Sequence, residues 1–409
     1  MSWSKQYPAI SPQNYPFNLD FLPKTAYLVG GAVRDALLLR EREYLDLDFV
    51  VFENAIAIAR QIAKHYRAGF VVLDKDRQIA RVVFDRATVD IALAEGKSQE
   101  MDLRRRDFTI NAIAYNPHSD ELIDPLEGRL DLARKMVKMV SKSNLEDDPL
   151  RLLRAYRQAA QLNFTIEAKT RSTIRDLSTS MNRVASERVR SELNYLLKDI
   201  NGTDWLVAAI EDGLLKPWLK HTEARNLALL TTIDPVIESL QEIQSFSCDI
   251  ILTKLASVVS KIPAEAELEL NNLKYSRIEI RTVTTALRNL SQLEQLNAPM
   301  TLKEEYFFFL AVGDVLPILA VLAISTGIDR RFIDPLIKRY LDPQDLVAHP
   351  QPLITGNDLI EVLKIKPSPQ IGLLLTEIQL AFIEGKISTE AEALELAKVI
   401  YLDNRKNLE

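Results

Sequence analysis

The chain has 409 residues, of which 51 are Lys or Arg and 57 are Asp or Glu, so its formal net charge is −6. This length exceeds what one ordinary hydrophobic core serves, so we expect more than one domain. The acidic balance excludes a global basic field, and any nucleic-acid partner must be held by a local patch. The single cysteine, Cys248, excludes an internal disulfide and is typical of a protein of the reducing cytoplasm.

The first part of the chain, from residue 25 to about 125, alternates short apolar runs with helical patterns. The spacing predicts strands at 26–29, 46–52, 70–73, 79–84 and 88–94 and helices at 33–40 and 54–67. From Leu132 onward the apolar residues recur at helical spacing almost throughout. The predicted fold is therefore an α+β head with a small mixed sheet, followed by all-α domains.

Turn residues near Pro125, Pro217 and Pro343 interrupt these patterns and mark candidate domain boundaries. We predict a head over residues 1–131, a helical neck over 132–216, a helical body over 217–345 and a helical tail over 346–409.

One apolar stretch, 306–325, is long enough to cross a membrane. Gly313, Asp314 and Pro317 lie at its centre, where lipid tolerates a carboxylate poorly and proline breaks a helix. We therefore predict two buried helices that are interrupted there, and no membrane partner. Residues 1–16 show no charged-then-apolar secretory pattern.

The junction of the first strand and helix contains Gly30-Gly31, which lets backbone approach a phosphate. On the next strand, Asp46 and Asp48 point to one face with Cα atoms about 6–7 Å apart, because strand side chains alternate. Two carboxylates on one face suit a pair of divalent metal ions. A lone Asp-x-Asp more often marks a solvated strand edge; the glycines and Arg34 favour a pocket for metal and phosphate.

Two further features follow on the head. Asp90, on the predicted strand 88–94, would complete the metal site or polarise an attacking hydroxyl if that strand lies beside 46–52. A run of three arginines then precedes an apolar segment. This run is either a solvated turn or a triphosphate site, in which Arg105 or Arg106 neutralises charge while Asp107 and Asn111 orient arginines or the ribose.

The predicted neck begins with a helix that Asp148 caps and Pro149 opens. Arg151, Arg154 and Arg157 recur every three residues and form a stripe along one face of it. The stripe is either solvated or functional. In the functional interpretation Asp148 pairs with Arg151 and the two read the polar edge of a base, while Arg154 and Arg157 hold phosphates.

Taken in order, these motifs resemble those of class II tRNA nucleotidyltransferases. The resemblance implies a nucleotidyltransferase head, a nucleotide-reading neck, and a body and tail that hold the acceptor half of tRNA. Such enzymes add CCA, or part of it, to tRNA 3′ ends from CTP and ATP. The matching residues are Gly30-Gly31-Ala32-Val33-Arg34-Asp35, Asp46-x-Asp48, Arg105-Arg106-Asp107-Phe108-Thr109-Ile110-Asn111-Ala112, Asp124-Pro125 with Gly128, Asp148-Pro149-Leu150-Arg151, and Ile354-Thr355-Gly356-Asn357-Asp358-Leu359.

The resemblance also implies roles for single residues. Asp46 and Asp48 would bind Mg²⁺, and Asp148 and Arg151 would read the base. Together, motifs and resemblance predict Asp46, Asp48 and Asp90 as catalytic residues. The predicted nucleotide-binding residues are Gly30, Gly31, Arg34, Arg105, Arg106, Asp107, Asn111, Asp148, Arg151, Arg154 and Arg157.

Three departures from the family pattern bear on specificity. Asp147 stands where the family usually has Glu, and Glu127 precedes Gly128 where paired glycines usually form a hinge. The stretch from Asp90 to Arg105 is short and lacks the flexible element that members completing CCA carry. This shortening resembles the CC-adding branch.

We therefore expect the chain to add two cytidines from CTP to the tRNA 3′ end and stop. Full CCA addition or A addition, with ATP as a substrate, and poly(A) synthesis are alternatives with the same chemistry. A catalytically silent RNA-binding protein is an alternative of another class. The sequence leaves the oligomeric state open and is compatible with a monomer.

Overall fold

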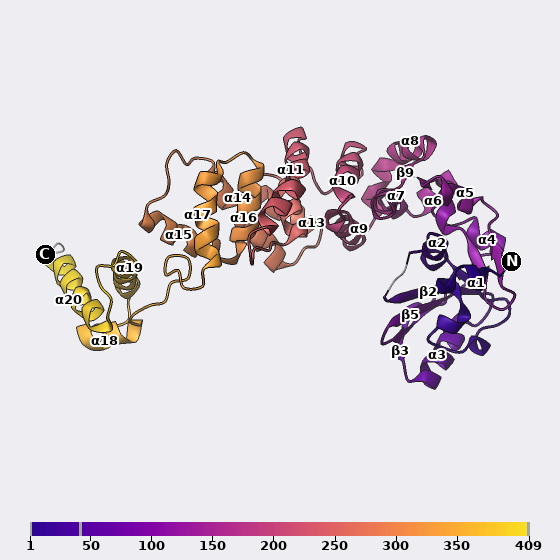
Figure 1. The fold of residues 1–409 in the computed structure, drawn as a ribbon, viewed down its shortest axis with the longest axis horizontal. Helices are drawn as coiled ribbons and strands as arrows, with labels where there is room; N and C mark the ends of the chain where they lie inside the picture. Colours follow the sequence, from indigo (N-terminus) through magenta and orange to yellow (C-terminus); the bar gives the residue numbers. More distant parts are fainter. Residues whose placement is uncertain (1, 41–42, 407–409) are drawn as a thin grey trace. The chain divides into compact units, whose positions relative to one another are not determined.

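The computed structural model describes residues 2–40 and 43–406, with side chains described as far as residue 403. It divides into two compact units, Met1–Pro217 and Trp218–Glu409. The first unit contains the sheet and the helices that follow it, and the second is helical throughout its described residues (Figure 1).

The sheet of the first unit is mixed, because β2 and β5 run parallel while the other neighbouring strands run antiparallel. This confirms the predicted head fold. All five predicted strands are present with ends shifted by a few residues, and two further strands extend the sheet beyond β1. The strands, in the order β3-β4-β5-β2-β1-β6-β7, are β1 (Tyr27–Val29), β2 (Leu45–Val51), β3 (Gly69–Asp74), β4 (Ile79–Phe84), β5 (Ala87–Leu93), β6 (Ala114–Asn116) and β7 (Glu121–Ile123).

Helix α3 (Ala55–Tyr66) covers strands β3, β4 and β5. It buries Ala55, Ala59, Ile62 and Ala63, whose spacing places them on one face, so an amphipathic sequence folds as a helix against the sheet. The other helices of this region are α1 (Trp3–Gln6), α2 (Gly31–Leu37), α4 (Gln99–Leu103) and α5 (Gly128–Ala133).

Five helices follow, within the same unit. Helix α7 packs on α9 and α10, and its Tyr156 donates a hydrogen bond to Asp212, which Arg171 and Arg175 also contact. A two-stranded pair, β8 (Met136–Val137) with β9 (Thr165–Ile166), interrupts the region that we expected to be all helical. The helices are α6 (Lys142–Asp147), α7 (Leu150–Leu162), α8 (Ala168–Leu177), α9 (Ser186–Lys198) and α10 (Gly202–Glu211).

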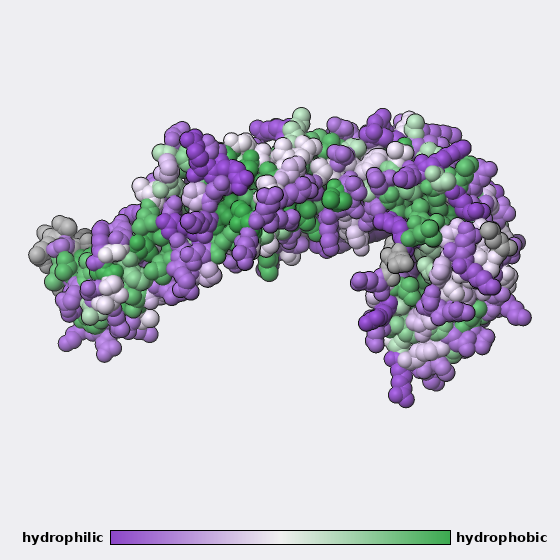
Figure 2. Space-filling model, viewed as in Figure 1, coloured by the Kyte–Doolittle hydropathy of each residue, from purple (hydrophilic) through white to green (hydrophobic). Residues whose placement is uncertain are grey.

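The second unit is built around α16, whose residues from Leu316 to Ala323 are all buried. This helix contacts α11, α12, α14 and α17, which explains why its sequence is apolar on every side. On the face seen in Figure 2, hydrophilic residues surround the apolar ones over these helices. Their bounds are α11 (Ala224–Gln241), α12 (Ile250–Val258), α13 (Pro263–Asn272), α14 (Arg277–Leu293), α15 (Leu302–Val312), α16 (Leu316–Ser325) and α17 (Arg330–Leu341).

The long apolar stretch of this unit is divided as predicted. Leu302–Ser325 has the length and hydropathy of a membrane span, and 56% of its most apolar window is buried inside the protein. Helix α15 ends at Val312, a 3₁₀ turn (Gly313–Val315) follows, and α16 begins at Leu316. These are two core helices of a folded unit, joined at the interruption that the sequence marks.

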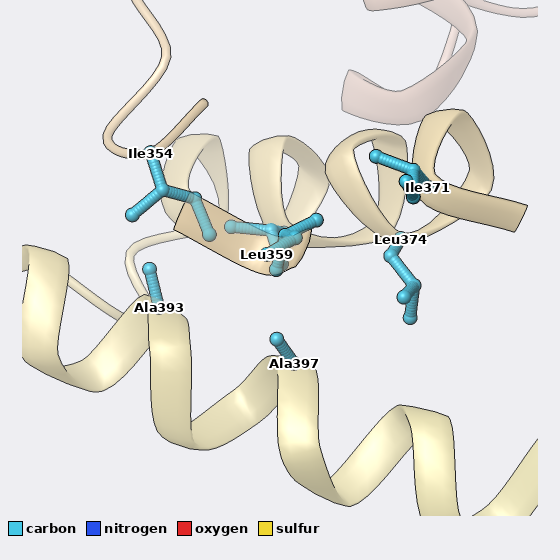
Figure 3. Packing of buried hydrophobic residues seen from close by; sticks show 7 residues of the cluster. Ile354, Leu359, Ile371, Leu374, Ala393 and Ala397 are labelled. Atoms are coloured by element: carbon cyan, nitrogen blue, oxygen red, sulfur yellow. The ribbon is translucent and has the colours of Figure 1, made fainter. Parts of the chain in front are cut away.

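The last three helices enclose a small core of their own. Helix α18 (Gly356–Leu363) starts at a capping box formed by Thr355 and Asp358. Figure 3 shows Leu359 lying between the side chains of α19 (Pro369–Ile383) and two alanines of α20 (Glu390–Lys406). Ala393 and Ala397 are one turn apart and fully buried, so α20 packs closely. The tail motif of the sequence therefore consists of a helix cap flanked by core residues.

Candidate active site

The β1–α2 junction brings backbone close to the head's charged side chains. Gly30 has φ +71°, a conformation that L residues rarely adopt. A Cβ on Gly30 would lie 3.3 Å from Nη1 of Arg106 and 3.6 Å from Oδ2 of Asp48. Glycine is thus needed here for its conformation and for the close approach of Arg106.

Strand register sets the positions of the carboxylates. Asp48 lies opposite Val29 on β1 and opposite Asp90 on β5, so strand 88–94 does lie beside strand 46–52, as the role proposed for Asp90 requires. Asp46, one pleat away, accepts a hydrogen bond of 2.7 Å from Oγ1 of Thr88. Three acidic side chains therefore lie within two neighbouring parallel strands.

The electrostatics of Asp48 favour a cation beside it. Burial, together with the negative charges of Asp46 and Asp90, raises the pKa of Asp48 to about 6, although Arg106 and Arg81 act to lower it. Oxygen ligands on one strand face fit a hard divalent cation, which takes one or two carboxylates and completes its shell with water or phosphate. The residues present therefore fit such an ion.

Asp90 has a different partner from Asp46 and Asp48. Both of its oxygens accept hydrogen bonds from Arg81 on β4, at 2.7 Å from Nε and 2.8 Å from Nη2. This pairing raises the pKa of Arg81. Among the residues that the structure describes, no group of three or more His, Cys, Asp or Glu is arranged to hold a metal ion. Asp90 is thus engaged in an ion pair with Arg81, and Asp46 and Asp48 remain the candidate metal ligands.

A hydrogen-bond network orients two of the arginines. Asn111 accepts a bond of 2.8 Å from Nη1 of Arg34, and its amide donates to Asp107 at 2.9 Å and to Gln158 at 3.0 Å. Asp107 also pairs with Arg154 at 3.1 Å. Asp107 and Asn111 thus orient arginines, as the sequence analysis suggested.

The charge state of Asp107 follows from this network. Burial opposes its ionisation, but Arg154 and the hydrogen bonds from Asn111 and the Phe108 amide outweigh burial and lower the pKa of Asp107. Arg154 is in turn kept charged by Asp107. The network therefore carries a fixed ion pair between the head and α7.

Arg106 lines two clefts. The first, about 400 Å³, is called here the catalytic cleft. From the head it is lined by Gly30, Gly31, Arg34, Asp46, Asp48, Arg106, Asp107 and Asn111, and from α7 and α9 by residues that include Arg154, Arg157 and Tyr195. The second, about 460 Å³, is the recognition cleft, lined by Arg105, Arg106, Asp148, Arg151 and Arg188. Arg105, predicted to bind triphosphate, lies only in the recognition cleft and pairs with Glu95 at 2.6 Å.

The base-reading pair expected on α7 is not formed as predicted. Asp148 pairs with Arg188 of α9 at 2.9 Å, and Arg151 donates to the backbone carbonyls of Arg105 and Asn144, both at 2.9 Å. The helix start is not the reason: Asp148 is extended, its carbonyl accepts from the Arg151 amide at 3.0 Å, and its carboxylate accepts from the Leu150 amide at 3.4 Å. The pair is absent because each of the two side chains has other partners. Both residues nevertheless line the recognition cleft.

Arg157 is also held by neighbours. It pairs with Glu192, donates to Gln161 at 2.7 Å, and lies over the ring of Tyr195, with its guanidinium carbon 5.6 Å from the ring centroid. Arg81, Arg188 and Tyr195 were not predicted from the sequence, because no local pattern marks them; Arg81 meets Asp90 across a strand pair, and the partners of Arg188 and Tyr195 lie far along the chain.

Comparison with known proteins identifies the family. Residues 26–138 match the poly A polymerase head domain, 163–225 the probable RNA and SrmB-binding site of polymerase A, and 247–397 a putative tRNA nucleotidyltransferase domain 2. A CC-adding tRNA nucleotidyltransferase of Synechocystis is 52% identical over 399 residues, covering 94% of this chain and 96% of that protein. The chain belongs to the class II tRNA nucleotidyltransferases.

Other relatives agree with this membership. A CC-adding tRNA nucleotidyltransferase of Geobacter sulfurreducens is 32% identical and covers 90% of each chain. A solved CCA-adding enzyme in complex with CTP is 25% identical, with a TM-score of 0.73, and covers 92% of this chain and 91% of its own. Family members are nucleotidyltransferases that use divalent metal ions. The predicted enzyme class is thereby confirmed, and the alternative of a silent RNA-binding protein is set aside.

Proposed function

We propose that this chain adds two cytidines from CTP to the 3′ end of tRNA, without a nucleic-acid template, and then stops. The observation that carries the specificity is the connection between β5 and α4, which runs only from Ala94 to Ser98. Family members that complete CCA carry a flexible element in this place. The 52% identity to a CC-adding relative supports the same proposal.

The short connection is also tied to α4. The amide of Glu95 donates to Oδ1 of Asp102 at 3.1 Å, and the Glu95 carboxylate pairs with Arg105 at 2.6 Å. Ser98 caps α4 by accepting from the Met101 amide at 3.3 Å. A segment held at both ends has little freedom to rearrange between a cytidine-binding and an adenosine-binding state.

We infer that Asp46 and Asp48 hold Mg²⁺. When bound, the ion would offset triphosphate charge and polarise the attacking hydroxyl. Arg34, fixed by Asn111, and Arg106, held by Asp102 at 3.1 Å, would contact the triphosphate with preset donors. In the same inference, Asp90 offsets the positive charge of Arg81 and does not bind the ion.

The recognition cleft is the place for the base in this proposal. Cytosine presents an amino donor and neighbouring acceptors on its polar edge. Asp148 is an acceptor and Arg151 a donor, and both are anchored by other residues rather than by one another. The pair can therefore meet the base without first breaking a mutual salt bridge.

The remaining assignments belong to the same proposal. The head would span 1–131, the nucleotide-reading neck 132–216, and the body (217–345) and tail (346–409) would hold the acceptor half of tRNA. The same proposal assigns the reaction to the cytoplasm.

The test uses purified protein and tRNA that lacks its last three nucleotides, with CTP alone, ATP alone, or both. We expect two cytidines from CTP, nothing from ATP alone, and no terminal adenosine with both. Completion of CCA when both nucleotides are present would contradict the proposed stop. Absence of any addition by the wild type would contradict the proposed function itself.

A further inference from the structure

Tyr195 is an exposed aromatic residue in an otherwise buried part of α9. Its helix neighbours Glu192, Leu193, Leu196 and Leu197 are all buried, yet Tyr195 keeps 52% of its surface open. Its side chain lines the catalytic cleft. Tyr195 therefore exposes part of its aromatic ring to the cleft that Asp46 and Asp48 also line.

The ring is also held in a fixed orientation. The Arg157 guanidinium lies over it at 5.6 Å, and Arg157 is itself fixed by Glu192 and Gln161. Glu192 is only 8% exposed, so this support is built into the packing of α7 against α9. A ring supported in this way provides a preset surface for a planar partner.

The two clefts differ in what they offer a substrate. Under the proposed function, the recognition cleft takes the base of CTP and the head takes its triphosphate. Transfer also needs the RNA 3′ end at Asp46 and Asp48, and these carboxylates share the catalytic cleft with Arg34, assigned above to the triphosphate, and with Tyr195. We propose that Tyr195 stacks on the 3′-terminal base of the RNA acceptor and so positions its hydroxyl. This inference rests on the proposed function.

Stacking also matches what the reaction demands at this point. Two successive additions present two different termini, first the end of the truncated tRNA and then a cytidine. An aromatic face accepts any base, whereas hydrogen-bond readout would reject one of them. Tyr195 would therefore hold the acceptor in both steps without specifying it.

The experiment compares Tyr195→Ala and Tyr195→Phe with the wild type in single-nucleotide addition from CTP. Loss of one stacked base predicts that Tyr195→Ala raises KM for the tRNA about 5-fold to 150-fold. KM for CTP is expected to stay unchanged, because its base lies in the other cleft. Tyr195→Phe keeps the ring and should restore the wild-type KM for tRNA.

A second acceptor makes the test specific for stacking. A tRNA whose 3′-terminal nucleotide is abasic should raise KM for the wild type but cause no further rise in Tyr195→Ala. Ile200→Ala is the matched control, because Ile200 closely follows α9, is 78% exposed, and should leave both KM values unchanged.

The outcomes separate the two proposals. If the wild type adds cytidines and Tyr195→Ala changes KM for CTP instead of tRNA, or changes neither, the role of Tyr195 is overturned. If Tyr195→Ala and the abasic acceptor act independently, stacking is overturned as well. If the wild type adds no cytidine at all, the proposed function fails first.

Discussion

The catalytic cleft and the recognition cleft share Arg106 but are built in different ways. In the catalytic cleft, sheet register places Asp48 beside Asp90, and Asn111 and Asp107 hold arginines from within a single sequence motif. In the recognition cleft, Asp148 depends on Arg188, which lies forty positions further along the chain, and Arg151 depends on backbone carbonyls. The catalytic cleft thus depends on the register of the head sheet and on the contact of the head with α7, whereas the recognition cleft depends on how α7 and α9 pack.

The largest expected effect lies in the catalytic cleft. Asp48→Asn removes one of two carboxylates proposed to hold the ion, and even an outer-shell change at a metal site costs about 10–100-fold in activity or metal affinity. We expect cytidine addition to fall by more than about 100-fold, with tRNA affinity nearly unchanged. Gel-shift binding and primer extension measure the two quantities separately. If Asp48→Asn keeps its activity, Asp48 does not hold the ion.

Asn111→Ala tests the local network. The change removes one acceptor of Arg34 and one donor each from Asp107 and Gln158, which costs about 1–3 kcal/mol where a buried polar group is left unsatisfied. We expect the free energy of unfolding to fall by that amount and KM for CTP to rise about tenfold. Denaturant unfolding and steady-state kinetics check both. If the free energy of unfolding falls but KM for CTP does not change, the network does not contribute to triphosphate binding.

Arg188→Ala tests the recognition cleft. Without its partner from α9, Asp148 is free to move, and we expect discrimination between CTP and other nucleotides to weaken about 5-fold to 10-fold. The rate at saturating CTP should change little, because the carboxylates and Arg34 are untouched. Lys198→Ala removes an exposed cation from the same helix and serves as the control. Unchanged discrimination in Arg188→Ala would show that the anchor is not needed for base reading.

The smallest effect concerns acid stability of the first unit. Burial opposes ionisation of Asp212, but hydrogen bonds from Arg171, Tyr156 and Arg175 outweigh it and lower the pKa of this carboxyl. A lowered folded-state pKa gives stability that is full above the unfolded value of about 3.9 and is lost as pH falls through the folded value. Thermal melting should therefore drop below about pH 4 more steeply in the wild type than in Asp212→Asn. Parallel curves would contradict this.

The head was largely predictable because its signals are local. Apolar runs separated by turns predicted strands that the structure contains. The alternation of strand side chains predicted that Asp46 and Asp48 lie on one face. Strands β6 and β7 were missed because each has only three residues, and Ala114 to Asn116 are buried without alternation. Pattern analysis needs longer runs than these.

The contacts between distant elements were not predictable from one sequence. The role of Asp90 required its strand to lie beside 46–52, an adjacency that the sequence could not show and the structure has, and nothing in the sequence indicated that Arg81 would occupy both of its oxygens. The expected Asp148–Arg151 pair assumed that the two side chains turn toward each other, whereas Arg188 holds Asp148 and backbone carbonyls hold Arg151. Tyr195 carries no motif at all, and its position depends on the packing of α9.

The most direct test of the central claim is to sequence tRNA 3′ ends after exhaustive incubation of CCA-less tRNA with CTP and ATP at equal concentrations. The account predicts ends that carry two cytidines and no adenosine, because the short β5–α4 connection is tied to its neighbours. Ends that carry a complete CCA would contradict it.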